Sequence, residues 1–255
     1  MIRLSTLLIL ALGLEQAAFA ESAESIAARA SENSAFSASH SRATLQMVLY
    51  RDGSRYRERR LTVITHKSGS SRRSRVTFLG PADISGTKFL SLEPTAGDTQ
   101  QFLYLPAFKK VKRIVGTERH KPFVQSDFSY ADLEGFDADD WRWRSLPDGD
   151  YKGEGCFVLE AVPKNSVERD YGKVMIWVHK KNLVALAADY YDKPGATVIK
   201  RYWAEKLAKR DDRWIPTSSF LETSSERTKT ELRVESIDFK SQVPESEFDQ
   251  AALER

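Results

Sequence analysis

Residues 227–235 read Arg-Thr-Lys-Thr-Glu-Leu-Arg-Val-Glu, and this stretch decides the fold class. Its even-numbered positions carry threonine, leucine and valine, whereas each odd-numbered position carries a charged side chain. Successive side chains of a β-strand point to opposite faces, so this period of two predicts a strand with one packed face and one face in water. Because antiparallel sheets commonly expose one face, the stretch predicts an antiparallel sheet with a wetted outer face.

Similar short runs, rich in β-branched and aromatic residues, follow one another along the chain. Turn-forming residues such as Asp52-Gly53 and Lys193-Pro194-Gly195 separate them, as hairpin connections require. So many strands in one sheet would curl strongly, and partial closure would reduce the exposed edges. We therefore predict a mainly β chain whose sheet forms a curved, half-open antiparallel barrel with an apolar concave side. The predicted strands are residues 43–50, 55–65, 75–79, 88–92, 100–105, 110–115, 141–146, 156–162, 173–179, 183–191, 197–207, 214–221 and 227–236.

Two segments depart from this strand pattern. Residues 25–35 are rich in alanine, serine and glutamate and can form a helix. Residues 116–140 are long for a connection between strands, and long connections in compact domains usually carry a function or a structure of their own. Ser126 can cap a short helix there, with Phe128, Ala131 and Leu133 partly on one face. We expect this segment to form a lid over the concave side.

The first twenty residues have the composition of a secretory signal peptide. A basic start at Arg3 is followed by the apolar run 4–14 and by Ala18-Phe19-Ala20, a small-residue cleavage pattern. The run is too short to span a bilayer, and the rest of the chain has no apolar run long enough to do so. We therefore predict cleavage after Ala20 and export to the periplasm of a soluble mature chain with no transmembrane segment. The alternative is an ordinary buried N-terminal helix.

The length and composition of the rest of the chain predict one domain, residues 21–255, and the alternative is two small ones. Cys156 is the only cysteine, so no intrachain disulfide can form, and the 41% hydrophobic content must supply the core. The 39 basic and 36 acidic residues give a net charge of +3, which is too small for a strong overall field. Any electrostatic recognition must therefore be local.

Sequence patterns that carry catalysis or hold a cofactor are absent. Neither a nucleophile elbow nor a phosphate- or dinucleotide-binding glycine motif occurs in the sequence. The histidines are scattered without metal-ligand spacing, at His40, His66, His120 and His179. We therefore predict no enzyme activity, no metal and no cofactor. An envelope hydrolase assembled from residues far apart in the sequence is the alternative.

Basic and aromatic residues supply the candidate binding positions. The basic side chains either decorate a solvated outer face or dock on anionic lipid headgroups or an acidic partner, while export argues against nucleic acid. The aromatic side chains near the long connection either fill the core or line a cavity. The basic positions are residues 51–60 with Arg72, Arg73 and Arg75, and then Lys109, Lys110, Lys112, Arg113, Arg119 and Lys121; the aromatic positions are Phe89, Phe102, Tyr104, Phe108, Phe123, Phe128, Tyr130 and Phe136.

The middle of the chain resembles a known family. The runs FLYLPAFKKVKRI, residues 102–114, and SDFSYADL, residues 126–133, are similar to a hallmark of the outer-membrane lipoprotein-sorting proteins. The likeness is to the LolA-like branch that includes a treponemal phospholipid-binding lipoprotein. It implies a half-open antiparallel barrel whose mouth is closed by helices and whose apolar cavity holds acyl chains. It further implies work beside a transporter of the resistance-nodulation-division (RND, MmpL-like) type in the inner membrane.

Together these observations predict a periplasmic carrier of lipid or lipoprotein acyl chains. We expect Phe128, Tyr130 and Leu133 to contact the chain from the lid, and Phe102 and Tyr104 to line the wall. Further cavity candidates are Phe89, Phe108 and Phe123, and the expected headgroup or partner contacts are Lys110, Lys112 and Arg113. The alternative function is an accessory subunit of an envelope transporter, with a barrel that is filled by its own side chains.

Overall fold

The computed structural model describes residues 21–33, 40–134, 138–164 and 171–255. The predicted signal peptide with its cleavage site at Ala20, and Phe136 of the long connection, lie outside these residues. No helix in the described ranges is long and apolar enough to cross a membrane.

The described strands form a single antiparallel sheet, as predicted. It has 13 strands in the order β6-β5-β4-β3-β2-β1-β13-β12-β11-β10-β9-β8-β7. Each half is a meander, and pairing of β1 with β13 joins the two halves in the middle. The bounds are β1 His40–Arg51, β2 Ser54–Ser68, β3 Ser71–Gly80, β4 Lys88–Glu93, β5 Gln100–Leu105, β6 Lys110–Ile114, β7 Trp141–Tyr151, β8 Glu154–Pro163, β9 Lys173–His179, β10 Ala185–Tyr191, β11 Val198–Arg210, β12 Arg213–Thr223 and β13 Thr228–Asp238.

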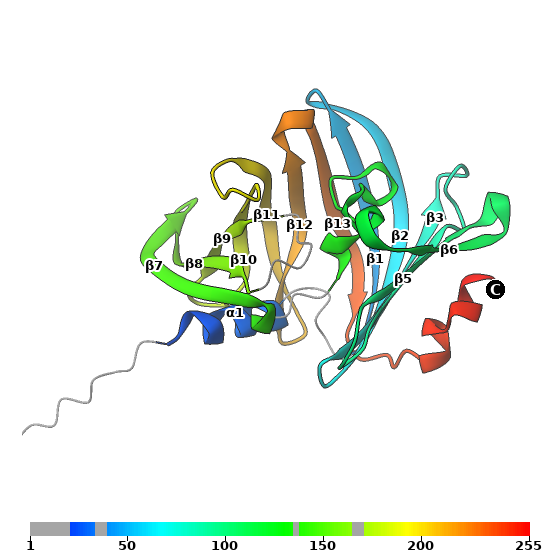
Figure 1. Ribbon diagram of the computed structural model, residues 1–255, viewed down its shortest axis with the longest axis horizontal. Coiled ribbons are helices and arrows are strands. Elements are labelled where there is room, and N and C mark those ends of the chain that lie inside the picture. The colour runs from blue at the N-terminus through cyan, green and yellow to red at the C-terminus, as the bar shows by residue number, and fades with distance from the viewer. Residues whose placement is uncertain (1–20, 34–39, 135–137, 165–170) are drawn as a thin grey trace, which may run out of the picture.

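This strand order explains why the connection after β6 is long. Strands β6 and β7 follow one another in the sequence but form the two opposite edges of the sheet. The edges do not pair, so the sheet curls without closing, and the predicted half-open antiparallel arrangement is confirmed. The chain must cross the sheet between these strands, and Figure 1 shows the crossing residues in front of the central strands. We call residues 115–134 the crossing segment, and the sheet face that they cover the inner face.

The inner face carries the two main parts of the core. The half formed by β1–β6 packs Leu45, Leu61 and Phe78 against the crossing segment. The half formed by β7–β11 is covered by helix α1, Ala23–Glu32, which buries Ile26 and Ala27 against strand residues. Ser22 caps this helix by accepting a hydrogen bond from the Ser25 N–H at 3.2 Å. The helix predicted over residues 25–35 is thus present and starts two residues earlier.

The C-terminal residues cover the outer face of β2–β5. Two 3₁₀ turns, Glu245–Phe248 and Gln250–Leu253, place Phe248 and Leu253 against Ile64, Leu90 and Phe102. Acidic residues of these turns pair with the arginines of β3: Arg75 with Glu247 at 2.5 Å and Arg73 with Glu245 at 3.5 Å. An acidic partner for this predicted basic stretch is therefore the chain's own C-terminal segment.

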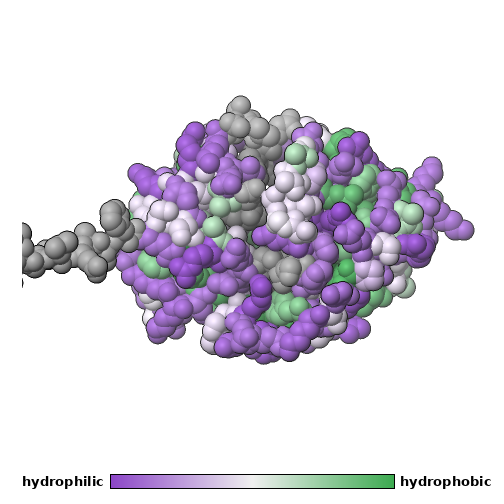
Figure 2. Space-filling model, turned by 90° about the horizontal axis from the view of Figure 1, so that it is seen from below, coloured by the Kyte–Doolittle hydropathy of each residue, from purple (hydrophilic) through white to green (hydrophobic). Residues whose placement is uncertain are grey.

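Seen from below, the molecule is mainly hydrophilic, and hydrophobic surface gathers on the side of β3–β6 (Figure 2).

Candidate functional site

The crossing segment folds through short 3₁₀ turns. They span Gly116–His120, Phe123–Gln125 and Ala131–Leu133, and no α-helix occurs in the described part of this segment. The prediction that Ser126 caps a helix is wrong, because Val124 and Gln125 adopt left-handed backbone angles (φ +49° and +63°) and end the turn there. The Ser126 hydroxyl instead donates to the Phe123 carbonyl at 2.7 Å.

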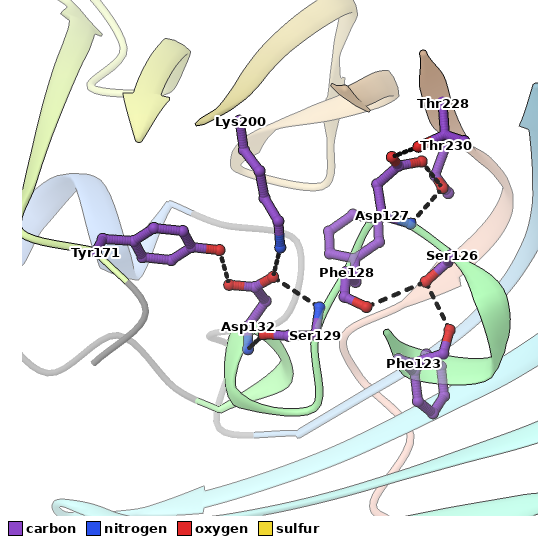
Figure 3. Close-up of polar contacts among 10 residues, drawn as sticks. All are labelled: Phe123, Ser126, Asp127, Phe128, Ser129, Asp132, Tyr171, Lys200, Thr228 and Thr230. Carbon is purple, nitrogen blue, oxygen red and sulfur yellow. Dashed lines mark hydrogen bonds and ion pairs between the residues drawn. The ribbon is translucent and has the colours of Figure 1, made fainter. Parts of the chain in front are cut away.

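A polar attachment holds the middle of the crossing segment on β13. Asp127 accepts hydrogen bonds from the Thr228 and Thr230 hydroxyls, both at 2.6 Å, and its own N–H donates to the Thr230 hydroxyl oxygen at 2.9 Å (Figure 3). Asp127 and Thr230 are both buried. The two threonines belong to the side of the strand that alternation marks as packed. Their hydroxyls therefore satisfy a buried carboxylate on the face that the sequence pattern predicted to be packed.

A second attachment reaches β11 on the far half of the sheet. Asp132 accepts from the Tyr171 hydroxyl at 2.7 Å and pairs with the Lys200 ammonium at 2.9 Å (Figure 3). The side chains of Asp132 and Lys200 are only 13% and 15% exposed. Tyr190 packs on the Tyr171 ring with 4.7 Å between the ring centroids. Burial raises the pKa of Tyr190, and the nearby charge of Asp132 raises it further. The crossing segment thus bridges the two halves through a largely buried ion pair.

A capping box prepares Asp132 for this contact. The Ser129 N–H donates to Asp132 Oδ2 at 2.7 Å, while the Asp132 N–H donates to the Ser129 hydroxyl at 3.2 Å. Ser129-x-x-Asp132 is the reciprocal pattern that starts a helical turn. This sequence signal was available, but the prediction placed the cap at Ser126. Lys200 had no comparable local signal, because its partner lies 68 residues away.

A third attachment involves a buried arginine. Arg59 of β2 is 2% exposed, and its guanidinium donates to the Val124 carbonyl and lies 5.9 Å from the centre of the Phe78 ring. Burial, followed by repulsion from Arg57, lowers the pKa of Arg59 to about 10. The alternation of β2 puts Arg59 on the inner face, opposite Met47 of β1. For this arginine, burial on the inner face contradicts both predicted positions, the solvated outer face and a surface that docks on headgroups or an acidic partner.

Aromatic rings fill the inner face beneath the first half of the crossing segment. Phe123 packs against Phe78 and Phe89 at 5.8 and 5.3 Å between ring centroids. Tyr130 closes the cluster at 5.6 Å from Phe89 and 5.5 Å from Phe123. All four are buried, and Leu133 packs at the margin of the same cluster. Phe89, Phe123 and Tyr130 are therefore core residues in this conformation.

An apolar groove remains between the crossing segment and helix α1. Its volume is about 190 Å³. Phe128 forms one wall, Ala30 and Asn33 at the end of α1 form the opposite wall, and strand residues form the floor. Of the predicted cavity residues, only Phe128 lines it. The floor and remaining lining residues are Leu45, Val184, Ala185, Tyr202, Pro216, Ser219, Leu232 and Val234.

The other predicted site residues lie elsewhere. Phe102 and Tyr104 point to the outer face and pack in the cluster covered by the C-terminal turns, so they do not line the groove. Phe108 is 70% exposed at the turn between β5 and β6. Phe102 and Tyr104 lie on the outer face because alternate residues of β5 face opposite sides; Leu103 and Leu105 face inward and pack in the same cluster as Phe89.

The predicted headgroup residues are also divided between two faces. Lys112 stands opposite the inner-facing Leu103, whereas Arg113 stands opposite the outer-facing Phe102. Lys110 shares the side of Lys112, since the two are separated by one residue in the same strand. Lys112 pairs with Glu118 at 2.5 Å.

Among the described residues, no group of three or more histidine, cysteine or carboxylate side chains could hold a metal.

The open 13-stranded sheet, with a helix and a crossing segment on its inner face, defines a protein of LolA-like fold. The chain belongs to the family whose model is described as "Uncharacterized protein", which matches residues 70–255. No curated protein matches the chain by sequence.

Solved structures show the same architecture. A DUF1329 family protein from Desulfovibrio piger superposes with a TM-score of 0.84 at 26% identity, covering 91% of this chain and 97% of that one. A putative outer membrane lipoprotein-sorting protein domain from Vibrio parahaemolyticus gives 0.83 at 28% identity, with 91% and 98% covered. The LolA superfamily protein NE2245 from Nitrosomonas europaea gives 0.73 at 18% identity, with 91% and 100% covered, and this likeness shows the fold alone.

Proposed function

We propose that this protein is a periplasmic carrier that shelters an acyl chain of a lipid or lipoprotein in the groove between α1 and the crossing segment. The observation that carries the proposal is the groove itself, whose walls and floor are almost entirely apolar. Ligand pockets of this character favour hydrocarbon over polar ligands. The likeness to the Vibrio lipoprotein-sorting domain supports the same class of cargo. The mechanism needs burial and release, with no bond chemistry.

The size of the groove sets how much cargo this conformation can take. At about 190 Å³ it is comparable to an engineered apolar cavity of about 150 Å³ that takes up benzene, so it holds a short stretch of hydrocarbon. Each methylene that leaves water contributes about 0.8 kcal/mol. A whole acyl chain needs more of the inner face, which the crossing segment now covers. We therefore propose that the crossing segment is the lid, and that loading separates Asp132 from Lys200.

Competition with a fluorescent fatty acid tests the groove. In Ala30→Phe a large ring fills the groove from α1, and we expect loss of at least about tenfold in affinity because several methylenes are displaced. Ala28→Phe adds the same ring on the same helix at a half-buried position outside the groove lining, and it serves as the matched control. Equal binding by both variants would refute the location of the site.

The rival function is an accessory subunit that carries nothing. The ring cluster of Phe78, Phe89, Phe123 and Tyr130 favours it, because half of the inner face is already filled. Native mass spectrometry of protein prepared gently from the bacterial envelope separates the two. Bound lipid that disappears in Ala30→Phe supports the carrier. A ligand-free protein that also fails to bind the fatty acid supports the accessory subunit.

Localisation and partnership belong to the same proposal. We propose that residues 21–255 form one exported domain, and that the periplasmic protein begins at Glu21. The intact mass of the protein from a periplasmic extract tests this, because retention of residues 1–20 would contradict it.

Partnership with an inner-membrane transporter of the RND or MmpL-like type stays a prediction from the family resemblance, and cross-linking in the envelope tests it.

A further inference from the structure

The turn between β5 and β6 presents an aromatic ring to solvent. Phe108 is 70% exposed, more than any other large hydrophobic side chain in the described part of the protein. The turn is well defined: Pro106 starts it, and the Lys109 N–H closes it on the Pro106 carbonyl at 3.1 Å. Proline restricts the backbone before the ring. Phe108 is thus held out from the fold by a short, closed turn.

Two lysines follow this ring in the sequence and have no carboxylate partner among the residues that the structure describes. Lys109 and Lys110 are exposed, and neither forms an ion pair within the described ranges. Leu79, which is 44% exposed, lies near the end of β3 on the same side of the molecule, since the loop after it approaches Pro106 at Gly86. The turn therefore combines a protruding aromatic ring with uncompensated positive charge, and Leu79 of β3 is a further exposed apolar side chain nearby.

Protection of the sheet edge explains only part of this arrangement. β6 is an edge strand, and lysines on an edge discourage pairing with other chains. On the opposite edge strand, β7, two of the four charged side chains have charged partners, since Arg144 pairs with Glu160 at 2.9 Å and Asp148 pairs with Lys180 at 2.5 Å. Edge protection does not require an exposed aromatic ring at the end of the hairpin.

We propose that the β5–β6 turn, with Phe108, Lys109 and Lys110 at its tip, docks the protein on the surface of an anionic lipid bilayer. Aromatic rings are favoured at the boundary between headgroups and acyl chains, and the lysine ammonium groups meet the negative surface. A protruding turn suits a soft surface better than a protein partner, because the main contacts of protein interfaces are packed in pockets within a larger patch. Docking stands apart from the carrier function, since it involves none of the groove residues.

Flotation with vesicles of phosphatidylcholine, with and without phosphatidylglycerol, tests the proposal on the mature chain. We expect binding only to the anionic vesicles, weakening as salt is added. Phe108→Asp should lower the partition coefficient by on the order of tenfold or more, since it removes the inserted ring. The double variant Lys109→Gln/Lys110→Gln should lower it on the order of 25-fold, about fivefold for each lost cation.

Trp214→Asp is the matched control. Trp214 is an exposed aromatic residue (41%) whose neighbouring turn carries Asp211, which pairs with Lys240, and Asp212, which lies near Lys209. Unchanged vesicle binding by this variant, and unchanged fatty-acid binding by the turn variants, is the expected pattern. The proposal is overturned if anionic vesicles do not bind the protein, or if the turn variants bind them as the wild type does. Capture of an acidic protein through the same turn, without vesicle binding, would likewise overturn it.

Discussion

The ion pair between Asp132 and Lys200 should control how firmly the crossing segment is held. Both side chains are largely buried, and Asp132 also accepts from Tyr171 and from the Ser129 N–H. Replacement of Lys200 by methionine removes one charge and leaves the carboxylate with neutral partners only. Breaking a buried pair in this way typically costs 3–5 kcal/mol, and the two remaining donors place the expected loss at about 3 kcal/mol.

Urea unfolding of a double-mutant cycle measures this contribution. The cycle uses Lys200→Met, Asp132→Asn and the double variant, and we expect a coupling energy of about 2 kcal/mol. The melting temperature of Lys200→Met should fall by about 6–12 °C, from about 2–4 °C per kcal/mol for a chain of this size. The m value should stay unchanged, because the fold is retained.

An exposed ion pair between the β7–β8 turn and β11 gives the control cycle. Lys152 and Glu205 lie 3.1 Å apart with side chains 57% and 44% exposed, so Lys152→Met with Glu205→Gln should show a coupling of at most about 1 kcal/mol. If the Asp132–Lys200 coupling is no larger than this, burial does not strengthen the attachment. The claim that this pair holds the crossing segment would then be wrong.

Three further predictions concern packing, backbone strain and pH. Phe123→Ala should lower the free energy of unfolding by about 3–5 kcal/mol in urea titrations, because it opens a cavity among Phe123's ring neighbours. Gln125→Gly should raise it by about 0.5–1 kcal/mol, since glycine relieves the positive φ at an exposed position, whereas Gln125→Ala should show no gain. Burial opposes ionisation of Glu231, but hydrogen bonds from Arg233 and Tyr50 outweigh it and lower its pKa. Its ionised form therefore stabilises the fold above its ordinary pKa of about 4.3, and the stability difference from Glu231→Gln should shrink as pH falls through the lowered pKa; a difference that stays constant down to pH values of about 2 would contradict this.

Local sequence patterns were sufficient to locate the strands. Each run predicted from alternation and turn residues corresponds to a strand of the sheet, with ends that differ by a few residues. The extension of β7 to Tyr151 was missed, because Pro147 and Gly149 interrupt the apolar pattern; a register shift in the β7–β8 pairing accommodates them. Strand order was not predictable in the same way, since pairing of β1 with β13 joins residues far apart in the sequence, such as Leu49 and Thr230.

The candidate site was predicted less completely than the fold. The long connection 116–140 was identified as special by its length, and Phe128 is the one predicted cavity residue that lines the groove. The wall residues Phe102 and Tyr104 were assigned to the wrong face of the sheet, because both faces of β5 carry apolar side chains and alternation alone cannot tell which face is inner. The C-terminal turns that cover the outer face had no strong periodic signal of their own.

The sequence by itself determined the fold class, the strands and the existence of a long connection, because these depend on the period of apolar residues and on local turn chemistry. Only the tertiary structure decided that β6 and β7 are opposite edges, that the connection crosses the inner face, and that Asp132 meets Lys200 there. It also decided that Phe108 lies in solvent while Phe89 lies in the core. Contacts of this kind depend on which strands pair over long separations, and a local pattern contains no information about that pairing.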